Sequence, residues 1–327
     1  MKSKTLKRAL ILCGGFYLLS ALIPLLAFLP TNGATEETQS PSSYSHKITS
    51  QTFRLQDADG SIFEVEESEF VIGGIAAEVP PTYPLEALKA QGVAVYTYYS
   101  RLREQSRSQE AKSDFTCNTE TGLVYVPKET RKERWGDSYE KWESTLEEVE
   151  KSIRGQTLQE DGALLCSTYF AISSGSTDDA ADVWGGEYSY LKPAASPGDI
   201  FASGYLSQAT FTISDGKKAI TDAFSKAEPG DDASKWISDV ERTGSGTIRK
   251  AKLCGQEATG TQLRNVFGLR SANFTWEVKD GKLVFTVKGW GHNVGMSQNG
   301  ARYMAENGAG YQEILSWYYP GSDLINN

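Results

Sequence analysis

A single glutamate stands two residues before a double proline, where a carboxyl group could act as a general acid. Glu78 is followed by Val79 and then by Pro80-Pro81, which cannot continue a helix. Apolar and small residues recur at helical spacing through this stretch, at Phe70, Val71, Gly74, Ile75, Ala76 and Val79. The pattern predicts a helix that carries Glu78 in its last turn.

The C-terminal end of a helix favours the protonated form of such a carboxyl group. The partial negative charge there disfavours an ionised Glu78 by about 0.3 to 1 kcal/mol, which raises its pKa by less than about one unit. An apolar pocket would have to supply most of the tuning that a general acid needs. The alternative interpretation is an ordinary solvated residue at a helix end.

A second helix is expected directly after the double proline. Pro84 suits the first position of a helix. Apolar residues then recur on one face, which predicts that this face packs in the core, at Leu85, Leu88, Val95, Tyr99 and Leu102. Glu78 is therefore expected on the rim between two packed helices.

Two later segments have the composition of loops that build sites. Residues 163–171 (ALLCSTYFA) predict a buried strand, which leads into SSGSTDDAADVWGGEYSYLK, a run dense in small, polar and aromatic residues. Loops at strand ends often carry binding and catalytic residues. Farther along, Gly289, Gly291 and Gly295 predict a tight backbone around His292. The other histidine, His46, lies in a polar linker and receives no role.

The expected elements alternate irregularly between strand and helix, which indicates an α+β fold. Hairpins are predicted from residues 53–55 with 62–65 and across 279–282. A strand or strand pair is expected at 115–126, and another strand from residue 250. Further helices are expected at 137–155, at 261–267 and in a segment ending at Gly308. The sequence contains no nucleotide-binding fingerprint and no internal repeat.

The composition describes a globular protein with an acidic surface. The 327 residues are 39% hydrophobic, carry a formal net charge of −9 and have a pI near 5.0. This balance argues against nucleic acid or an anionic membrane surface as the main partner. A neutral or weakly charged substrate fits better.

The first residues predict a single-pass membrane protein. Residues 9–30 are almost wholly apolar, and Lys2, Lys4, Lys7 and Arg8 precede them. We expect a cytoplasmic tail (1–8), a signal anchor (9–30), a flexible linker (31–52) and one extracytoplasmic domain (53–327). Cleavage after the anchor is the alternative, because small residues follow the apolar run.

Three cysteines, Cys117, Cys166 and Cys254, lie outside this apolar segment. An odd number cannot all pair within the chain. One disulfide is possible and none is needed, because a domain of this size does not depend on such cross-links.

Four stretches together resemble the stage II sporulation protein D family of peptidoglycan lytic transglycosylases. They are AAEVPPTYPLEALKAQGVAVYTY, STYFAISSGSTDDAADVWGGEYSYLK, TGTQLRNVFGLRS and GWGHNVGMSQNGARYMAENGAGYQEILSWYY. They occur in one order over about residues 60 to 321. The resemblance implies cleavage of glycan strands between N-acetylmuramic acid and N-acetylglucosamine, which leaves a 1,6-anhydro sugar end.

Within that resemblance, Glu78 occupies the position of the family's catalytic glutamate, which precedes a Met-Pro step there and Val79-Pro80 here. A neutral Glu78 would protonate the glycosidic oxygen. The resulting carboxylate would take the proton of the sugar's own 6-hydroxyl as that oxygen attacks C1. Because the nucleophile belongs to the substrate, no second carboxylate is required.

The same matching assigns substrate-handling roles to Thr177, Tyr190, Lys192 and His292. Thr177 and Tyr190 could hydrogen-bond sugar hydroxyl or N-acetyl groups, and Lys192 could steady the glutamate carboxylate. His292 could orient Glu78 or the sugar. The alternatives are loop capping for the first two, a solvated lysine, and a buried histidine that holds a glycine turn. Four aromatic residues could stack on sugar faces or belong to the core: Trp184, Trp290, Trp317 and Tyr318.

The chain departs from the family pattern at three further places. Tyr96, a further substrate-binding candidate, stands where the family commonly has an arginine. Loss of that cation should raise the pKa of Glu78 if the two residues are close, and it should weaken contacts to an anionic substrate. Asn293 replaces a glycine after His292. Some members bind zinc after the long helix, but only Cys117 stands in that region, so no functional metal and no cofactor is predicted.

A second class of function stays open. Other proteins with this domain stimulate a cell-wall amidase, so the alternative is a non-catalytic glycan-binding protein that acts through such an enzyme. By the resemblance, the partners are peptidoglycan glycan strands, with peptides already removed, and an amidase or other engulfment membrane proteins.

Overall fold

The computed structural model describes residues 52–326, which divide into two compact units. The first unit contains the residues up to Thr168, together with 304–316 and 321–326. The second contains 169–303 and 317–320. The predicted tail (1–8), anchor (9–30) and linker (31–52) lie outside the described residues, except for Thr52. Among residues 52–326, no helix combines the length and apolar character needed to cross a membrane.

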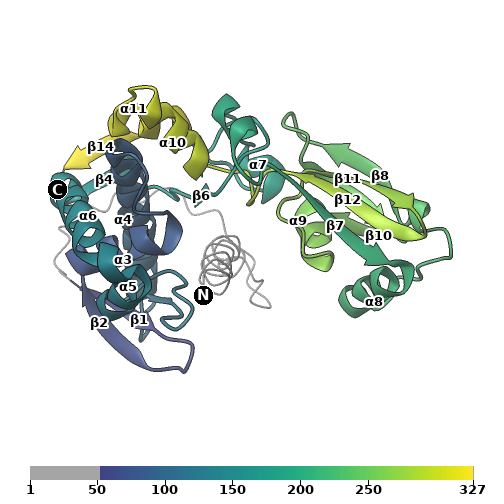
Figure 1. Ribbon diagram of the computed structural model, residues 1–327, viewed down its shortest axis with the longest axis horizontal. Helices are drawn as coiled ribbons and strands as arrows, with labels where there is room; N and C mark the ends of the chain where they lie inside the picture. Colours follow the sequence, from purple (N-terminus) through teal and green to yellow (C-terminus); the bar gives the residue numbers. More distant parts are fainter. Residues whose placement is uncertain (1–51, 327) are drawn as a thin grey trace, which may run out of the picture. The chain divides into compact units, whose positions relative to one another are not determined.

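The first unit begins with the predicted hairpin. β1 (Thr52–Gln56) pairs antiparallel with β2 (Ile62–Glu66), and β3 (Phe115–Thr116) joins β1 in parallel (Figure 1). The expected strand over 115–126 is therefore short, and the chain continues in a turn that is closed by a bridge between Asn118 and Leu123. Phe53 and Leu55 are fully buried beneath the hairpin.

Two helices follow on either side of the double proline, as predicted. α3 (Glu67–Glu78) is buried along all of residues 70–78, and α4 (Leu85–Ser108) begins directly after Pro84. Leu88, Val95 and Tyr99 are buried as expected, whereas Leu85 is 44% exposed because it lies in the first turn, outside the packed part of the helix.

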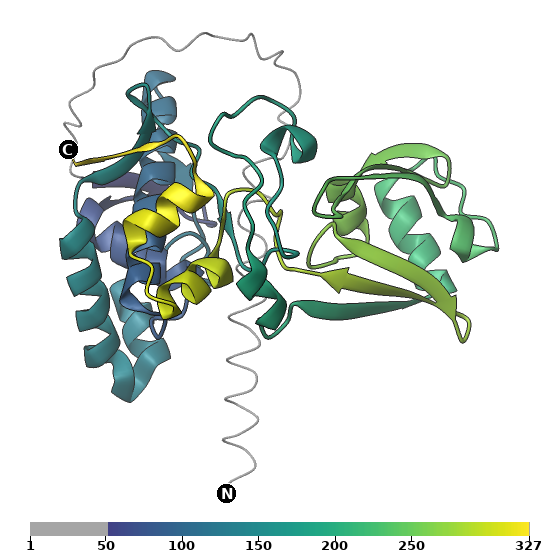
Figure 2. The same cartoon turned by 90° about the horizontal axis from the view of Figure 1, so that it is seen from above.

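α6 (Tyr139–Ile153) packs against α4 at a glycine, and the two long helices lie side by side in Figure 2. A Cβ atom at Gly92 of α4 would lie 2.4 Å from Cδ1 of Ile153, so a larger residue there would require the Ile153 side chain to move. The short α5 (Lys128–Trp135) precedes α6 and carries the fully buried Arg131.

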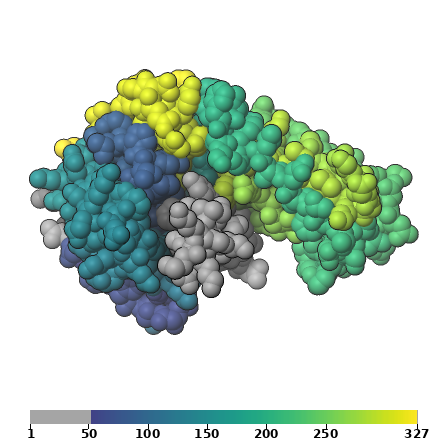
Figure 3. All heavy atoms as spheres, in the orientation of Figure 1, coloured from purple at the N-terminus to yellow at the C-terminus, as the bar shows by residue number. Residues whose placement is uncertain are grey.

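The remaining strands of the first unit come from opposite parts of the sequence. β4 (Gln156–Glu160) pairs antiparallel with β5 (Ala163–Leu164) on one side and with β14 (Asp323–Asn326) on the other. α11 (Tyr311–Tyr318) begins in this unit, where the backbone N–H of Tyr311 donates to Glu86 Oε2 over 2.8 Å. Figure 3 shows the yellow C-terminal segment directly against the blue start of α4.

The second unit has its own core, although the sequence predicted one domain over residues 53–327. β7 (Leu206–Thr212) pairs with β12 (Lys282–Lys288), which pairs with β11 (Phe274–Lys279) in an antiparallel sheet (Figure 2). A second antiparallel sheet has the order β10-β9-β8 (Gln256–Thr259, Ile248–Leu253, Ile237–Arg242). α8 (Ile213–Ala223) and α9 (Gly260–Val266) pack on these strands. Phe274, Phe285 and Leu263 are buried between them.

The two loop segments that the sequence marked as candidate sites, residues 173–192 and the glycine-rich segment around His292, belong to this second unit. The expected strand 163–171 is present only as β5 and β6 (Tyr169–Phe170), which pairs in parallel with β13 (Met296–Ser297). The loop carries α7 (Ala180–Val183) and the 3-10 helix η2 (Pro197–Phe201), and α10 (Gln298–Glu306) follows β13. The mixed α+β class predicted from the sequence is confirmed.

Cys117, Cys166 and Cys254 are free thiols. Within residues 52–326, no group of three or more His, Cys, Asp or Glu side chains could hold a metal ion.

Candidate functional site

Glu78 is the final residue of α3 and is 6% exposed. The next residue, Val79, leaves the helix in an extended conformation (φ −135°, ψ 151°), while its N–H still donates to Ile75 O over 3.0 Å. A residue that precedes proline is driven out of the helical region, so Pro80 fixes the helix end at this place. The predicted last-turn position of Glu78 is confirmed, and its catalytic role stays a prediction.

The surroundings of Glu78 on its own helix favour the neutral acid. The last turn of α3 contains no basic residue, whereas its acidic residues Glu67 and Glu69 lie in the first turn. Burial of the carboxyl group and the negative end of the helix both disfavour its ionised form. This combination suits a group that must donate a proton.

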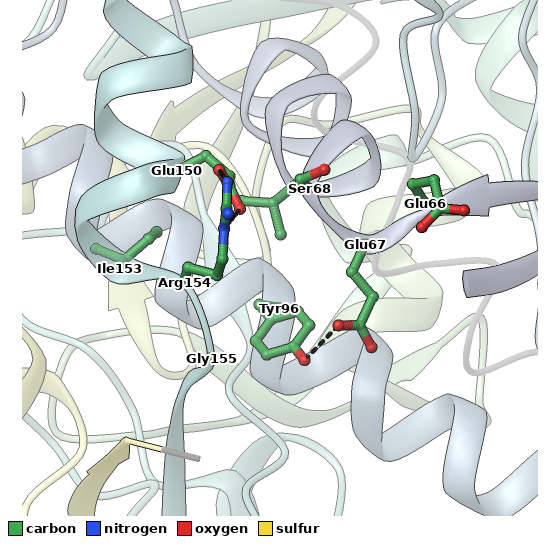
Figure 4. Close-up of a pocket in the computed structure, with 9 residues that line it drawn as sticks. Glu66, Glu67, Ser68, Tyr96, Glu150, Ile153, Arg154 and Gly155 are labelled. Carbon is green, nitrogen blue, oxygen red and sulfur yellow. Dashed lines mark hydrogen bonds and ion pairs between the residues drawn. The ribbon is translucent and has the colours of Figure 1, made fainter. Parts of the chain in front are cut away.

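Tyr96 belongs to α4 and contacts the end of α3 that is opposite to Glu78. Its hydroxyl donates to Glu67 Oε2 over 3.1 Å, as Figure 4 shows, and Glu67 also accepts from Arg103 over 2.6 Å. Burial and the adjacent Glu67 raise the pKa of Tyr96 to about 12. Eleven residues of helix separate Glu67 from Glu78, about 16 Å at 1.5 Å per residue. Tyr96 is therefore not close to Glu78, and the expected effect of this residue on the pKa of Glu78 does not apply.

Tyr96 borders a cavity of about 180 Å³ at the start of α3 (Figure 4). Val71 and Ile153 form its apolar wall, and Ser68 and Arg154 contribute polar groups. Arg154 pairs with Glu150 over 2.7 Å, and Glu66 and Glu67 add two further carboxyl groups to the lining. Glu78 is not among its lining residues, so this cavity does not serve the predicted acid.

Thr177 and Lys192 are close together in the second unit, and both are engaged with the protein itself. Thr177 is 1% exposed, and its Oγ1 accepts from the Ala194 N–H over 2.8 Å. Lys192 Nζ donates to Asp179 Oδ2 over 2.9 Å. Burial acts to raise the pKa of Asp179, but the Lys192 ammonium and the Ala181 N–H outweigh it and hold that pKa below its usual value. Lys192 keeps 43% of its side chain exposed and remains accessible to a ligand.

The tyrosine and tryptophan candidates divide by burial. Tyr190 is 7% exposed and packs its ring edge-on against Tyr188 at 5.8 Å. Trp290 and Tyr318 are 3% and 1% exposed, which places them in the core. Trp317 is 48% exposed and is open to a sugar ring.

His292 uses both ring nitrogens for the backbone. Nδ1 accepts from the Val294 N–H over 3.2 Å, so the proton lies on Nε2, which is 3.1 Å from Tyr169 O. Burial, reinforced by Arg264, lowers the pKa of His292 to about 3. The neutral ring lies between Phe170 and Trp184 at 5.3 and 4.9 Å. These contacts fit a buried histidine that holds the glycine turn better than a histidine that orients Glu78 or the sugar.

Asn293, which the sequence marks only as a replaced glycine, connects the loops around it. Its φ of 70° lies in the left-handed region, where asparagine is among the best-tolerated non-glycine residues. Its Nδ2 donates to Asp178 Oδ2 over 2.7 Å, and its Oδ1 accepts from the Ser174 N–H over 3.3 Å. Asn293 therefore adopts a left-handed backbone conformation that glycine adopts easily, and its side chain adds hydrogen bonds that a glycine could not make.

Comparison with known proteins identifies the family. Residues 57–156 match the family described as Stage II sporulation protein. Stage II sporulation protein D of Bacillus amyloliquefaciens is 30% identical over 336 residues, covering 98% of this chain and 96% of the relative. The chain belongs to the stage II sporulation protein D family. Stage II sporulation protein D of Bacillus subtilis (strain 168) is 31% identical over 269 residues, covering 82% of this chain and 76% of the relative.

The stage II sporulation protein D family also extends to a differently named protein. The amidase enhancer of Bacillus subtilis (strain 168) is 27% identical over 302 residues, which cover 78% of this chain and 40% of that protein. Together these matches make the chain a sporulation and cell-wall protein of this family.

Proposed function

We propose that the chain is a lytic transglycosylase that cleaves peptidoglycan glycan strands with Glu78 as the single general acid and base. The observation that carries this proposal is a buried carboxyl group at the C-terminal end of α3, directly before Val79-Pro80. Family membership supports it, because Glu78 corresponds to the glutamate to which the resemblance assigns the catalytic role.

The reaction needs no water and no second catalytic carboxylate. Neutral Glu78 gives its proton to the oxygen that joins N-acetylmuramic acid to N-acetylglucosamine, and the bond from that oxygen to C1 breaks. The 6-hydroxyl oxygen of the muramic acid bonds to C1, and its proton goes to the Glu78 carboxylate. Glu78 is then neutral again, and the products are a free 4-hydroxyl and a 1,6-anhydro end.

Thr177, Tyr190, Lys192 and His292 have a supporting role in this proposal. Thr177 and His292 shape the loops of the second unit through backbone bonds, whereas the exposed Lys192 can meet a sugar directly. In the proposal, the protein acts at the cell membrane with this domain outside the cytoplasm, behind the predicted anchor.

The deciding experiment is incubation of the purified chain with peptide-free glycan strands, followed by mass spectrometry of the fragments. Anhydro-ended fragments, 18 mass units lighter than hydrolytic products because no water is added, support the proposal. Absence of these fragments over the pH range 4 to 9 contradicts it.

A non-catalytic role is the second candidate, since a relative is named amidase enhancer. In that case the chain binds glycan without cleaving it and raises the rate of a cell-wall amidase. Adding such an amidase to the same assay, with intact peptidoglycan, distinguishes the two functions by the release of peptides instead of anhydro sugars.

A further inference from the structure

The second unit displays three aromatic side chains around one loop. Phe201, at the end of η2, is 75% exposed, which is unusual for a phenylalanine. Tyr303 of α10 and Trp317 of α11 are 38% and 48% exposed. We call these three residues the aromatic platform. All belong to the second unit.

Each ring of the platform has a defined position. The Trp317 indole N–H donates to Ala195 O over 2.8 Å, which fixes the ring at the start of the loop. Tyr303 lies so close over Gly198 that a Cβ atom there would be 2.2 Å from its ring. Phe201 stacks on Tyr303 with ring centroids 6.5 Å apart and planes 27° apart. Fixed rings lose little conformational entropy when a ligand binds.

A buried polar network holds the loop beneath these rings. Ser196 Oγ lies 2.7 Å from the Tyr318 hydroxyl and donates to Asp199 Oδ2 over 2.8 Å. Asp199 is fully buried and also accepts from Asn299 over 3.1 Å. Tyr318, the residue after Trp317, and Asn299, near the start of α10, are therefore both hydrogen-bonded to this loop.

The loop that carries Phe201 presents no exposed charge. Residues 193–203 (PAASPGDIFAS) contain one charged side chain, Asp199, and that side chain is buried. A pyranose ring presents a face of C–H groups, which packs on an aromatic ring without needing a charge. A charged partner would gain nothing from this loop.

The loop beneath the platform is also hydrogen-bonded to Thr177, a residue that the proposed function uses. Thr177 bonds to Ala194 in both directions, and Ala194 directly precedes the residue that anchors Trp317. Lys192 lies two residues earlier. From Ala195 to Gly198 the chain spans at most about 11 Å, so one short oligosaccharide can contact both ends of the platform.

We propose that Phe201, Tyr303 and Trp317 form a sugar-stacking surface that holds a stretch of the glycan strand beside the loop of Thr177 and Lys192. This inference rests on the proposed function for its ligand, but it concerns binding and not cleavage. Removal of a ring should weaken glycan binding about 5- to 10-fold. In an active chain the same removal should raise KM and leave kcat unchanged.

The test measures binding of the chain to immobilised peptide-free glycan strands by biolayer interferometry, with Glu78→Gln as the parent so that cleavage cannot interfere. Phe201→Ala and Trp317→Ala should each raise Kd. Trp317→Phe, which keeps a ring, should recover part of the affinity. Val278→Ala, a change at a 43% exposed residue of β11 in the same unit, is the matched control and should leave Kd unchanged.

The outcomes separate this inference from the proposed function. Unchanged Kd in Phe201→Ala, which is too exposed to affect folding, overturns the platform, as does a parent that binds no glycan. Weaker binding in the variants, together with a wild-type chain that releases no anhydro ends, keeps the platform and removes the proposed catalysis. Unchanged glycan binding with lost stimulation of an amidase shows a protein-docking surface and contradicts the inference.

Discussion

Asn293 and Asp178 are joined by a 2.7 Å hydrogen bond from an amide nitrogen to a carboxylate oxygen. Both residues are buried, at 5% and 2% exposure, and the backbone N–H of Asp178 donates to Asn293 O over 2.7 Å in return. The glycine turn after His292 and the loop before α7 are therefore connected twice at one place.

This connection predicts how Asn293 responds to substitution. Asn293→Ala should destabilise the chain by about 2 to 4 kcal/mol, because it combines left-handed strain with the loss of the Asp178 partner. Asn293→Gly should cost less, since glycine removes the strain. Urea unfolding checks the order, and an alanine variant as stable as the glycine variant would contradict it.

Glu78→Gln tests the acid directly. The amide keeps the size of the side chain but has no transferable proton, so release of anhydro ends should fall by about 10² to 10⁴ or more. Folding and glycan binding should be retained. Glu66→Gln, at the exposed residue before the other end of α3, is the matched control and should cleave at the normal rate. Near-normal cleavage by folded Glu78→Gln would move the catalytic role elsewhere.

Tyr96→Phe should affect stability without affecting cleavage. It removes the hydrogen bond to Glu67, which is worth about 0.5 to 1.5 kcal/mol. Because Tyr96 lies at the far end of α3 from Glu78, the pH profile of anhydro-end release should stay the same. A shifted acidic limb in this variant would show that Tyr96 does act on the catalytic group.

His292 should make the folded state sensitive to acid. Its pKa is about 3 when folded and about 6.5 when unfolded, so between these values the unfolded chain binds a proton that the folded chain does not. Stability from this residue is present above pH 6.5 and is lost as the pH falls towards 3. Unfolding free energies of His292→Gln should fall less steeply over this range, and an unchanged slope would show that the ring titrates normally.

Arg131 should be among the most sensitive residues of the first unit. Its guanidinium is fully buried and pairs with Glu69 over 2.9 Å and with Glu143 over 2.6 Å. Arg131→Met leaves Glu143 buried without this partner and should cost about 3 to 5 kcal/mol. The neighbouring Lys132→Met, at an exposed position of α5, should change the unfolding free energy by less than about 0.5 kcal/mol. Equal effects of the two substitutions would argue against the network.

Local signals predicted the beginning of the first unit well. The periodic stripe before Pro80 and the turn at residues 57–60 predicted α3, α4 and the hairpin close to their observed bounds. The second unit depends on pairing between β7 and β12, which are about 75 residues apart in the sequence. No local pattern specifies that pairing, so the periodicity of the sequence did not indicate the core of the second unit.

For the site, the sequence identified residue types and loops but not hydrogen-bond partners. His292 stands in a glycine-rich segment, which fits a catalytic residue as well as a structural one. Only the bonds to Val294 and Tyr169 separate the two interpretations. The role of Asn293 could have been suspected, because asparagine in place of a glycine indicates a left-handed backbone.

The pairing of β14 with β4 also sets the order in which the chain can fold during synthesis. Residues 156–159 emerge from the ribosome long before their partners at 323–326 exist. The second unit, apart from residues 317–320, can form while the first still has an open strand edge. An open edge promotes association with other chains, so this interval is when the nascent protein most needs protection from aggregation.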